Sequence, residues 1–135
     1  MPAHLVRVRD LYPAAPYAYA SVAPPGSLVF SAGACPLDEA GVVADRGDHA
    51  AQARRVIDNL RTALAAAGAN LDDVLKTTVY VASADRRDLL EVWQVVHAAF
   101  GSHDAPSTLL GVSVLGYEGQ LVEIDAVALV AAASR

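Results

Sequence analysis

Residues 107–129 limit the possible folds more than any other part of this sequence. They contain two apolar, strand-forming segments on either side of a short turn bracketed by Gly116 and Gly119, which predicts two β-strands joined tightly. Glu123 and Asp125 lie two residues apart in the second strand, so their side chains point to one face of the sheet. A carboxylate in an apolar strand is costly to bury without a partner. We therefore expect solvent, a second subunit or a ligand on this face.

The size of the chain predicts a single domain over residues 1–135. A length of 135 residues is enough for one hydrophobic core and too short for two. Hydrophobic residues make up 54% of the sequence, which is more apolar surface than one small core needs. Association with copies of the same chain would bury the remainder, so we expect an oligomer.

The charge balance argues against a nucleic-acid partner. Fifteen acidic and ten basic residues give a formal net charge of −5, and the basic residues are scattered along the chain. Phosphate binding needs clustered lysine and arginine. No apolar run reaches the length of a membrane span, and the N-terminus lacks a signal-peptide pattern. We therefore expect a cytoplasmic protein with no membrane partner.

The sequence predicts neither a metal site nor a cofactor. Cys35 is the single cysteine, which excludes an internal disulfide and a cysteine-based zinc site within one chain. The four histidines do not have metal-ligand spacing, and no glycine-rich phosphate loop or dinucleotide motif is present. We expect Cys35 to be a small buried apolar residue in the loop that follows the third strand.

The order of the predicted elements is that of an α+β fold. We expect strands at residues 5–9, 17–23, 28–32 and 75–81, helices at 48–67 and 86–100, and the two terminal strands. The second and third strands are predicted to form a hairpin around the Pro24-Pro25-Gly26 turn. Two helices can cover only one face of the resulting sheet. The other face is expected to meet another subunit.

Apolar periodicity assigns the faces of these elements. The first helix is expected to bury residues spaced three and four apart, which are Ala53, Val56, Ile57, Leu60, Leu64 and Ala67. The second helix begins after an Asp85 N-cap, and its apolar face consists of Leu89, Trp93, Val96 and Phe100. In the strand that starts at Ser107, the expected core residues are Thr108, Leu110, Val112 and Val114. The opposite face is small and mildly polar, and is expected to approach a ligand or another chain.

Four phrases of the sequence, in their order and spacing, resemble the RidA/YjgF family, also called L-PSP. They are APYAYA at 15–20, LVFSAGACPLD at 28–38, AQARRVIDNLRTALAAAGANLDDVLKTTVYV at 51–81 and LVEIDAVAL at 121–129. The resemblance implies a chorismate-mutase-like fold, with a six-stranded mixed sheet and two helices on one face. It also implies a homotrimer with clefts between the subunits.

The resemblance further implies a small-molecule site for the hydrolysis of 2-imino or enamino acids to 2-oxo acids and ammonia. Tyr17, Gly33 and Glu123 match the tyrosine, glycine and glutamate of the family site. Glu123 is the expected general base or water-positioning group, and Tyr17 is the second expected catalytic residue. The expected ligand-binding residues are Gly33, Ala32, Trp93, Ser107 and Thr108.

Three of these positions depart from the family pattern. Ser107 stands where the family has the arginine that binds the substrate carboxylate, Ala32 stands in place of a serine, and Trp93 in place of an asparagine. A serine hydroxyl cannot form the bidentate, charge-assisted pair that a guanidinium forms with a carboxylate. The expected substrate therefore lacks the usual carboxylate or does not depend on it. Lys76 or an arginine of a neighbouring subunit is an alternative anchor.

Other functions and roles are also compatible with the sequence. The chain could be a metabolite-binding or interaction trimer without activity, while ribonuclease or translation-inhibitor activity fits poorly with the acidic charge balance. Ser107 is equally well explained as a strand-start residue bonded to the backbone, and Tyr17 as an interface residue. Trp93 could simply belong to the core with His97 beside it, one helical turn away.

Overall fold

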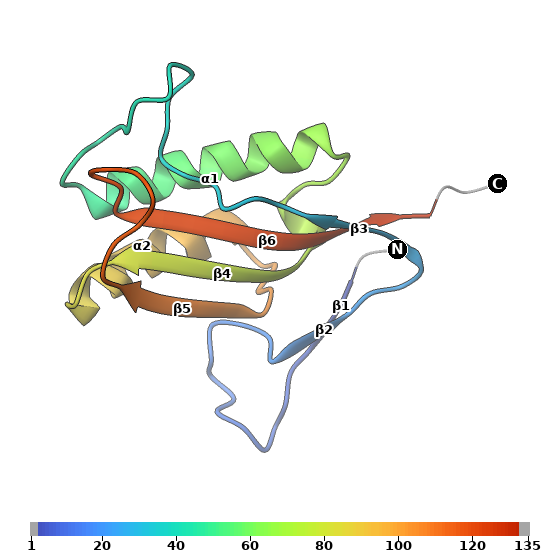
Figure 1. Ribbon diagram of the computed structural model, residues 1–135. Coiled ribbons are helices and arrows are strands. Elements are labelled where there is room, and N and C mark those ends of the chain that lie inside the picture. The colour runs from blue at the N-terminus through green and yellow to red at the C-terminus, as the bar shows by residue number, and fades with distance from the viewer. Residues whose placement is uncertain (1–2, 133–135) are drawn as a thin grey trace.

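The main sheet is four-stranded and mixed, with the strand order β3-β6-β4-β5. The computed structural model describes residues 3–132, and Figure 1 shows how their elements are arranged. The strands are β3 (Gly26–Phe30), β6 (Val122–Ala131), β4 (Val74–Ala82) and β5 (Ser107–Val112). β6 is antiparallel to both of its neighbours, whereas β5 runs parallel to β4 at the edge of the sheet.

Two helices pack on one side of this sheet, as the sequence predicted. They are α1 (His49–Ala66) and α2 (Arg86–Phe100), and both expected ranges are confirmed to within one residue. Asp85 is the N-cap of α2, since its Oδ1 accepts a hydrogen bond from the Arg87 N–H at 2.9 Å. Gly68 follows α1 with a φ of +87°, a conformation that favours glycine. A 3₁₀ turn, η1 (Leu71–Asp73), leads into β4.

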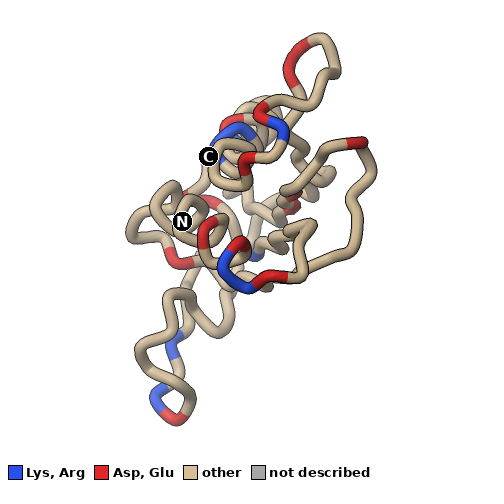
Figure 2. The backbone as a smooth tube through the Cα atoms, turned by 90° about the vertical axis from the view of Figure 1, so that its left-hand side faces the viewer, with Lys and Arg blue, Asp and Glu red and all other residues tan. Residues whose placement is uncertain are grey.

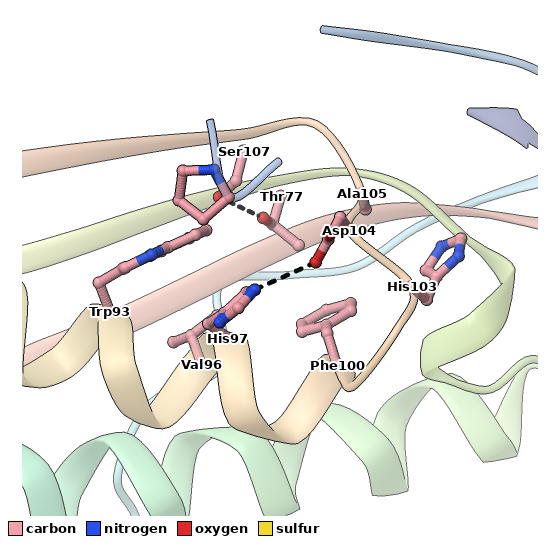
Figure 3. A pocket seen from close by; sticks show the side chains of 10 residues that line it. Thr77, Trp93, Val96, His97, Phe100, His103, Asp104, Ala105 and Ser107 are labelled. Atoms are coloured by element: carbon pink, nitrogen blue, oxygen red, sulfur yellow. Dashed lines mark hydrogen bonds and ion pairs between the residues drawn. The ribbon is translucent and has the colours of Figure 1, made fainter. Parts of the chain in front are cut away.

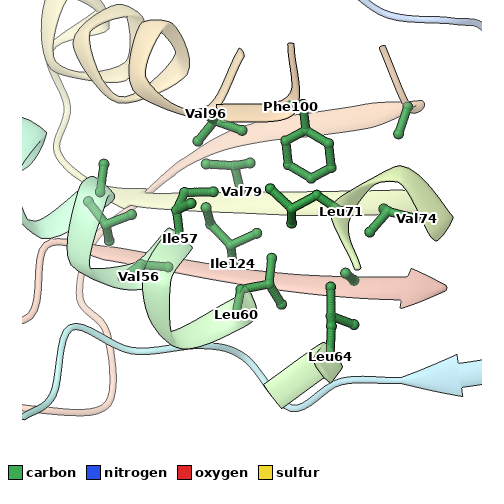
Figure 4. Packing of buried hydrophobic residues seen from close by; sticks show 14 of the residues in the cluster. Val56, Ile57, Leu60, Leu64, Leu71, Val74, Val79, Val96, Phe100 and Ile124 are labelled. Atoms are coloured by element: carbon green, nitrogen blue, oxygen red, sulfur yellow. The ribbon is translucent and has the colours of Figure 1, made fainter. Parts of the chain in front are cut away.

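The core lies between the two helices and the sheet. Figure 4 shows side chains of α1 and α2 pointing toward alternate residues of β4 and β6. The expected apolar face of α1 is buried except at Ala67, and the fully buried strand residues include Val79, Val81, Val122 and Ile124. Within residues 3–132, no helix is long and apolar enough to cross a membrane.

The predicted hairpin of residues 17–23 with 28–32 is wrong. β2 (Ala20–Val22) pairs instead with β1 (His4–Val6) in a separate two-stranded antiparallel sheet, and β3 pairs with β6. The six strands thus form two sheets rather than the one expected. Pro24 and Pro25 explain the difference, because prolines do not supply the positive-φ residues of a two-residue hairpin turn. The Ser21 hydroxyl links the small sheet to β4 by donating to the Leu75 carbonyl at 2.6 Å.

The terminal strands do not pair with each other either. β5 and β6 lie on opposite sides of β4. The predicted core face of β5 is also wrong, since Thr108 and Leu110 are exposed while Leu109 packs against the core. The cause is the register at the start of β5, where the Ser107 hydroxyl bonds the buried Thr77 on the helix side of the sheet. Odd-numbered residues of β5 therefore face α2.

Candidate functional site

The Glu123 carboxylate is held in one orientation by two donors. Its Oε1 accepts hydrogen bonds from Gln120 Nε2 at 3.1 Å and from the Cys35 thiol at 3.2 Å. Its Oε2 lies against the backbone of Gly33. A β-carbon added at residue 33 would overlap this oxygen. The structure therefore brings Gly33 and Glu123 together, as the resemblance implied, and leaves Oε2 as the carboxylate oxygen that neither donor occupies.

The loop before β6 is fixed by two buried glutamines that sequence reasoning did not identify. Gln120 is 3% exposed, and its amide group also donates to the Val122 carbonyl at 3.1 Å. Gln52 of α1 is fully buried and donates to the Gly119 carbonyl at 3.0 Å, while accepting from the Leu121 N–H at 2.7 Å. The available signal was Gln52 itself, a polar residue next to Ala53 on the apolar side of a helical pattern.

Cys35 is not the buried apolar residue that was expected. It is partly exposed, and its thiol donates to Glu123. Burial, followed by the hydrogen bond to Glu123 and the charge of that carboxylate, raises the pKa of Cys35 to about 11. The thiol consequently keeps its proton near neutral pH and acts as a hydrogen-bond donor rather than as a nucleophile.

Polar side chains of β4 and β6 share the sheet face that the helices leave open. Tyr80 lies opposite Glu123 in the strand register, and its hydroxyl donates to Asp125 Oδ2 at 3.2 Å. Burial and then the Asp125 charge raise the pKa of Tyr80. Lys76 Nζ donates to the Thr108 hydroxyl at 2.7 Å. The Lys76 ammonium therefore reaches across to the side chain of Thr108 in β5, next to Ser107.

A second group of expected site residues lines a pocket at the β5 edge of the sheet. This aromatic pocket has a volume of about 390 Å³ and is lined by Pro16, Tyr17, Trp93, Ser107, Thr108 and Leu109. Figure 3 shows the neighbouring space between α2 and β5, where His97 bonds Asp104 and Thr77 bonds Ser107. That neighbouring space has only about 10 Å³, roughly enough for one water molecule. The larger pocket is therefore the one with room for a ligand.

The two groups cannot meet around one ligand within a single chain. Ser107 bonds Thr77 on the helix side of the sheet, whereas Glu123 lies on the open side, opposite Tyr80. Tyr80 comes three positions after Thr77 in β4, so the side chains of these two residues point to opposite faces of the sheet. Tyr17, Trp93, Ser107 and Thr108 thus lie together, and Gly33 lies with Glu123. Ala32 is exposed beside Gly33, and its methyl side chain cannot form a hydrogen bond with either group.

The charged residues of the described chain do not suggest a metal centre. Across residues 3–132, no three histidine, cysteine, aspartate or glutamate side chains gather closely enough to hold a metal ion. Asp104 near the aromatic pocket is paired with Arg7, whose Nη2 lies 2.6 Å from Asp104 Oδ2. What the site offers chemically is one oriented carboxylate on the open face and one uncharged aromatic pocket at the edge.

The fold and these sites define a small α+β protein of the Rid type. The family model described as "Endoribonuclease L-PSP" matches residues 8–130. The chain therefore belongs to the RidA/YjgF (L-PSP) family.

Several relatives illustrate the range of this family. Protein DfrA of Myxococcus xanthus is 35% identical over 114 residues, which cover 84% of this chain and 85% of that protein. A protein of Salmonella typhimurium named 2-iminobutanoate/2-iminopropanoate deaminase is 38% identical over 81 residues, or 59% of this chain and 60% of its own length.

A solved structure confirms the fold. The Rid-family protein YyfB of Yersinia pestis superposes with a TM-score of 0.90 at 26% identity, covering 96% of this chain and all of that one. Rv2704 of Mycobacterium tuberculosis, described as a YjgF-family member, has a TM-score of 0.65 at 32% identity and covers 95% of this chain and 99% of its own.

Proposed function

We propose that this protein hydrolyses the C=N bond of a small imine, or of the imine tautomer of an enamine, in clefts that form between copies of the chain. The observation that carries the proposal is the fixed Glu123 carboxylate, with Oε1 held by Gln120 and Cys35 and Oε2 left beside the Gly33 backbone. A carboxylate oriented in this way can accept a proton from a water molecule as that water attacks an electrophilic carbon.

The reaction balances with water as the single co-reactant. The water oxygen adds to the imine carbon while one water proton passes to Glu123 Oε2. That proton then moves to the nitrogen, which gives a carbinolamine. Glu123 next takes the carbinolamine hydroxyl proton and passes it to the nitrogen as the C–N bond breaks, so the products are a carbonyl compound and ammonia. Tyr17 and the Gly33 backbone would orient the substrate, and neither a metal nor a cofactor is required in this scheme.

Association of subunits would complete the site. Tyr17 and Glu123 lie in separate groups within one chain, so a second copy must supply one group to the other. The open sheet face is suited to this role because it exposes large apolar side chains, with Leu28 at 51% and Phe30 at 71% exposure. Two neighbouring carboxylates and Lys76 on the same face allow charge pairing between copies. We propose the homotrimer that the family resemblance implies.

The substrate would not depend on an arginine–carboxylate pair. None of the residues that line the aromatic pocket is charged, and the two cations bonded to its lining, Lys76 and Arg7, are engaged with Thr108 and with Asp104. RNA is disfavoured as a substrate because acidic and basic positions are interspersed along the chain in Figure 2, and the net charge is −5. The proposed partner is therefore a small molecule, bound in the cytoplasm.

The proposal is tested by ammonia release from freshly generated 2-iminobutanoate, 2-aminoacrylate and imines without a carboxylate. We expect turnover of the imines without a carboxylate, and a loss of about 100-fold or more in the Glu123→Gln variant. Glu91→Gln, an exposed acid on α2, is the matched control and should retain full activity. Turnover that survives in Glu123→Gln would refute the assigned role. Saturable binding without any turnover would instead identify a metabolite-binding trimer.

A further inference from the structure

One aromatic wall of the pocket is held by a series of contacts within the chain. Trp93 stacks on His97 with ring centroids 5.9 Å apart and an interplanar angle of 20°. His97 Nε2 in turn lies 3.2 Å from Asp104 Oδ1, and Asp104 is paired with Arg7 at 2.6 Å. This chain of contacts fixes the orientation of the indole ring. A preorganised wall does not have to be ordered when the ligand binds.

The opposite aromatic wall is fixed by separate contacts. Tyr17 meets Tyr19 edge-to-face, with ring centroids 5.7 Å apart and an interplanar angle of 73°. The Tyr19 hydroxyl donates to the Tyr12 carbonyl at 2.8 Å, and Arg7 Nη1 donates to the Tyr17 carbonyl at 2.7 Å. Arg7 thus bonds the loop that carries Tyr17 and also Asp104, the residue that contacts Trp93 through His97. One guanidinium sets the position of both aromatic walls.

The polar end of the pocket has hydrogen-bond donors to offer. Thr108 Oγ1 accepts from Lys76 Nζ, and Ser107 Oγ accepts from Thr77 Oγ1, both at 2.7 Å. A hydroxyl group carries one proton besides its lone pairs, so a hydroxyl that accepts a hydrogen bond in this way can still donate its own proton. Thr108 points to the open face beside Lys76, so Ser107 carries the hydroxyl on the same side of the sheet as Trp93. A ligand atom at this end should therefore be an acceptor rather than a donor.

We propose that the aromatic pocket binds a flat, conjugated ring of the substrate, with a carbonyl oxygen or ring nitrogen at its edge facing the Ser107 hydroxyl. The proposal rests on the proposed function in that this ring belongs to the molecule whose C=N bond is hydrolysed. Two aromatic side chains, a proline and a leucine form walls that suit a planar apolar group. A volume of about 390 Å³ accommodates one such ring with its substituents.

Three small probes test this assignment without any turnover. Benzamide has a flat ring and a carbonyl acceptor, cyclohexanecarboxamide has the same amide on a puckered ring, and benzylamine has the flat ring without an acceptor. Trp93 is the single tryptophan of the chain, so its indole N–H gives one NMR signal that reports on the pocket. Affinities follow from titrations of this signal, and from ligand-observed NMR in variants that lack tryptophan.

We expect benzamide to bind about 2- to 10-fold more tightly than cyclohexanecarboxamide, because aromatic stacking adds to area burial. Benzylamine should bind more weakly than benzamide. Trp93→Phe should keep the preference for the flat ring, and Trp93→Leu should remove it. Ser107→Ala should weaken benzamide binding by about 2- to 10-fold. Leu90→Ala, an exposed site on the same helix, is the matched control and should change none of these values.

Equal affinities for the two amides, or tighter binding of benzylamine, would overturn the proposal. The comparison of probes on the unmodified protein decides the matter even if Trp93→Leu fails to fold. The outcome is also separable from the proposed hydrolysis. Preference for benzamide in a protein that turns over no imine would contradict the hydrolase assignment alone, whereas imine turnover without that preference would contradict the present inference alone.

Discussion

Gly33 lies directly against the side chain of Glu123, and a β-carbon at residue 33 would stand 2.6 Å from the carboxylate carbon. The atoms that would have to move belong to the end of a flexible side chain rather than to the backbone. A substitution at this glycine should therefore disturb the proposed catalytic group more than it disturbs the fold. This relationship gives the first prediction.

Gly33→Ala should lower imine hydrolysis by about tenfold or more, because it turns the carboxylate away from the orientation set by Gln120 and Cys35. Thermal unfolding should change by only a few degrees, on the order of 1 kcal/mol or less. Gly116→Ala is the matched control, since no atom lies within 4 Å of its added β-carbon and its φ is not positive. Activity that survives in Gly33→Ala would show that the Glu123 orientation is not required.

The Cys35 thiol should react slowly with iodoacetamide at neutral pH. Its pKa of about 11 keeps the reactive thiolate scarce until the pH approaches that value. Glu123→Gln should lower the pKa because the acceptor carboxylate and its charge are removed, although burial, the largest cause, remains. The rate of alkylation measured against pH reports both values. A midpoint that does not move in Glu123→Gln would contradict the Cys35–Glu123 hydrogen bond.

The raised pKa of the Cys35 thiol also predicts how the free energy of unfolding changes in alkali. The folded protein binds the Cys35 proton more tightly than the unfolded chain does, since the pKa rises from 9.0 to about 11 on folding. The stabilisation is therefore complete below pH 9 and is lost as the pH rises toward 11. Chemical unfolding across this pH range should show a loss of stability that is steeper in the wild type than in Cys35→Ala, since Tyr80, whose pKa is also raised, contributes equally to both proteins. Parallel pH dependences would contradict the prediction.

Gln52→Met should destabilise the protein by about 1–3 kcal/mol, because the partly buried bonds to the Gly119 carbonyl and the Leu121 N–H are lost. Gln52 is fully buried and joins α1 to the Gly119 carbonyl and the Leu121 N–H. Urea unfolding measures the change. Gln94→Met, an exposed site on α2, should stay within about 0.5 kcal/mol of the wild type. An equally small effect at Gln52 would mean that the loop before β6 does not depend on this side chain.

Phe30→Glu should convert the proposed trimer into monomers. Phe30 is 71% exposed on the face that the helices leave open, and a charge there would be costly to bury between copies. Sedimentation velocity gives the mass of the particle. Leu90→Glu, at a 55% exposed position on the outer side of α2, should remain trimeric. If both variants kept the mass of the wild type, another surface would have to hold the subunits together.

Local periodicity of apolar residues was sufficient to predict the two helices and the alternation of side chains between the two faces of β6. Asp48 and Asp85 precede regular apolar spacing, so the bounds of α1 and α2 followed from contacts between residues three and four apart. The face shared by Glu123 and Asp125 likewise followed from the two-residue period of a strand. The association of Gly33 with Glu123 came from family resemblance, and the structure brings those two residues together.

Strand partners were not predictable in the same way, because hydrogen bonds between strands join residues that are distant in the sequence. Closeness in the sequence predicted hairpins between neighbouring segments, whereas in the structure β3 pairs with β6 and β5 pairs with β4. The register of Ser107 beside Thr77 then decided that Leu109, and not Leu110, faces the helices. The sequence by itself determined the helices, the alternation of the long strands and the family. Only the tertiary structure decided that Ser107 and Glu123 lie on different faces of the sheet, since a one-residue change of register exchanges the faces of a strand.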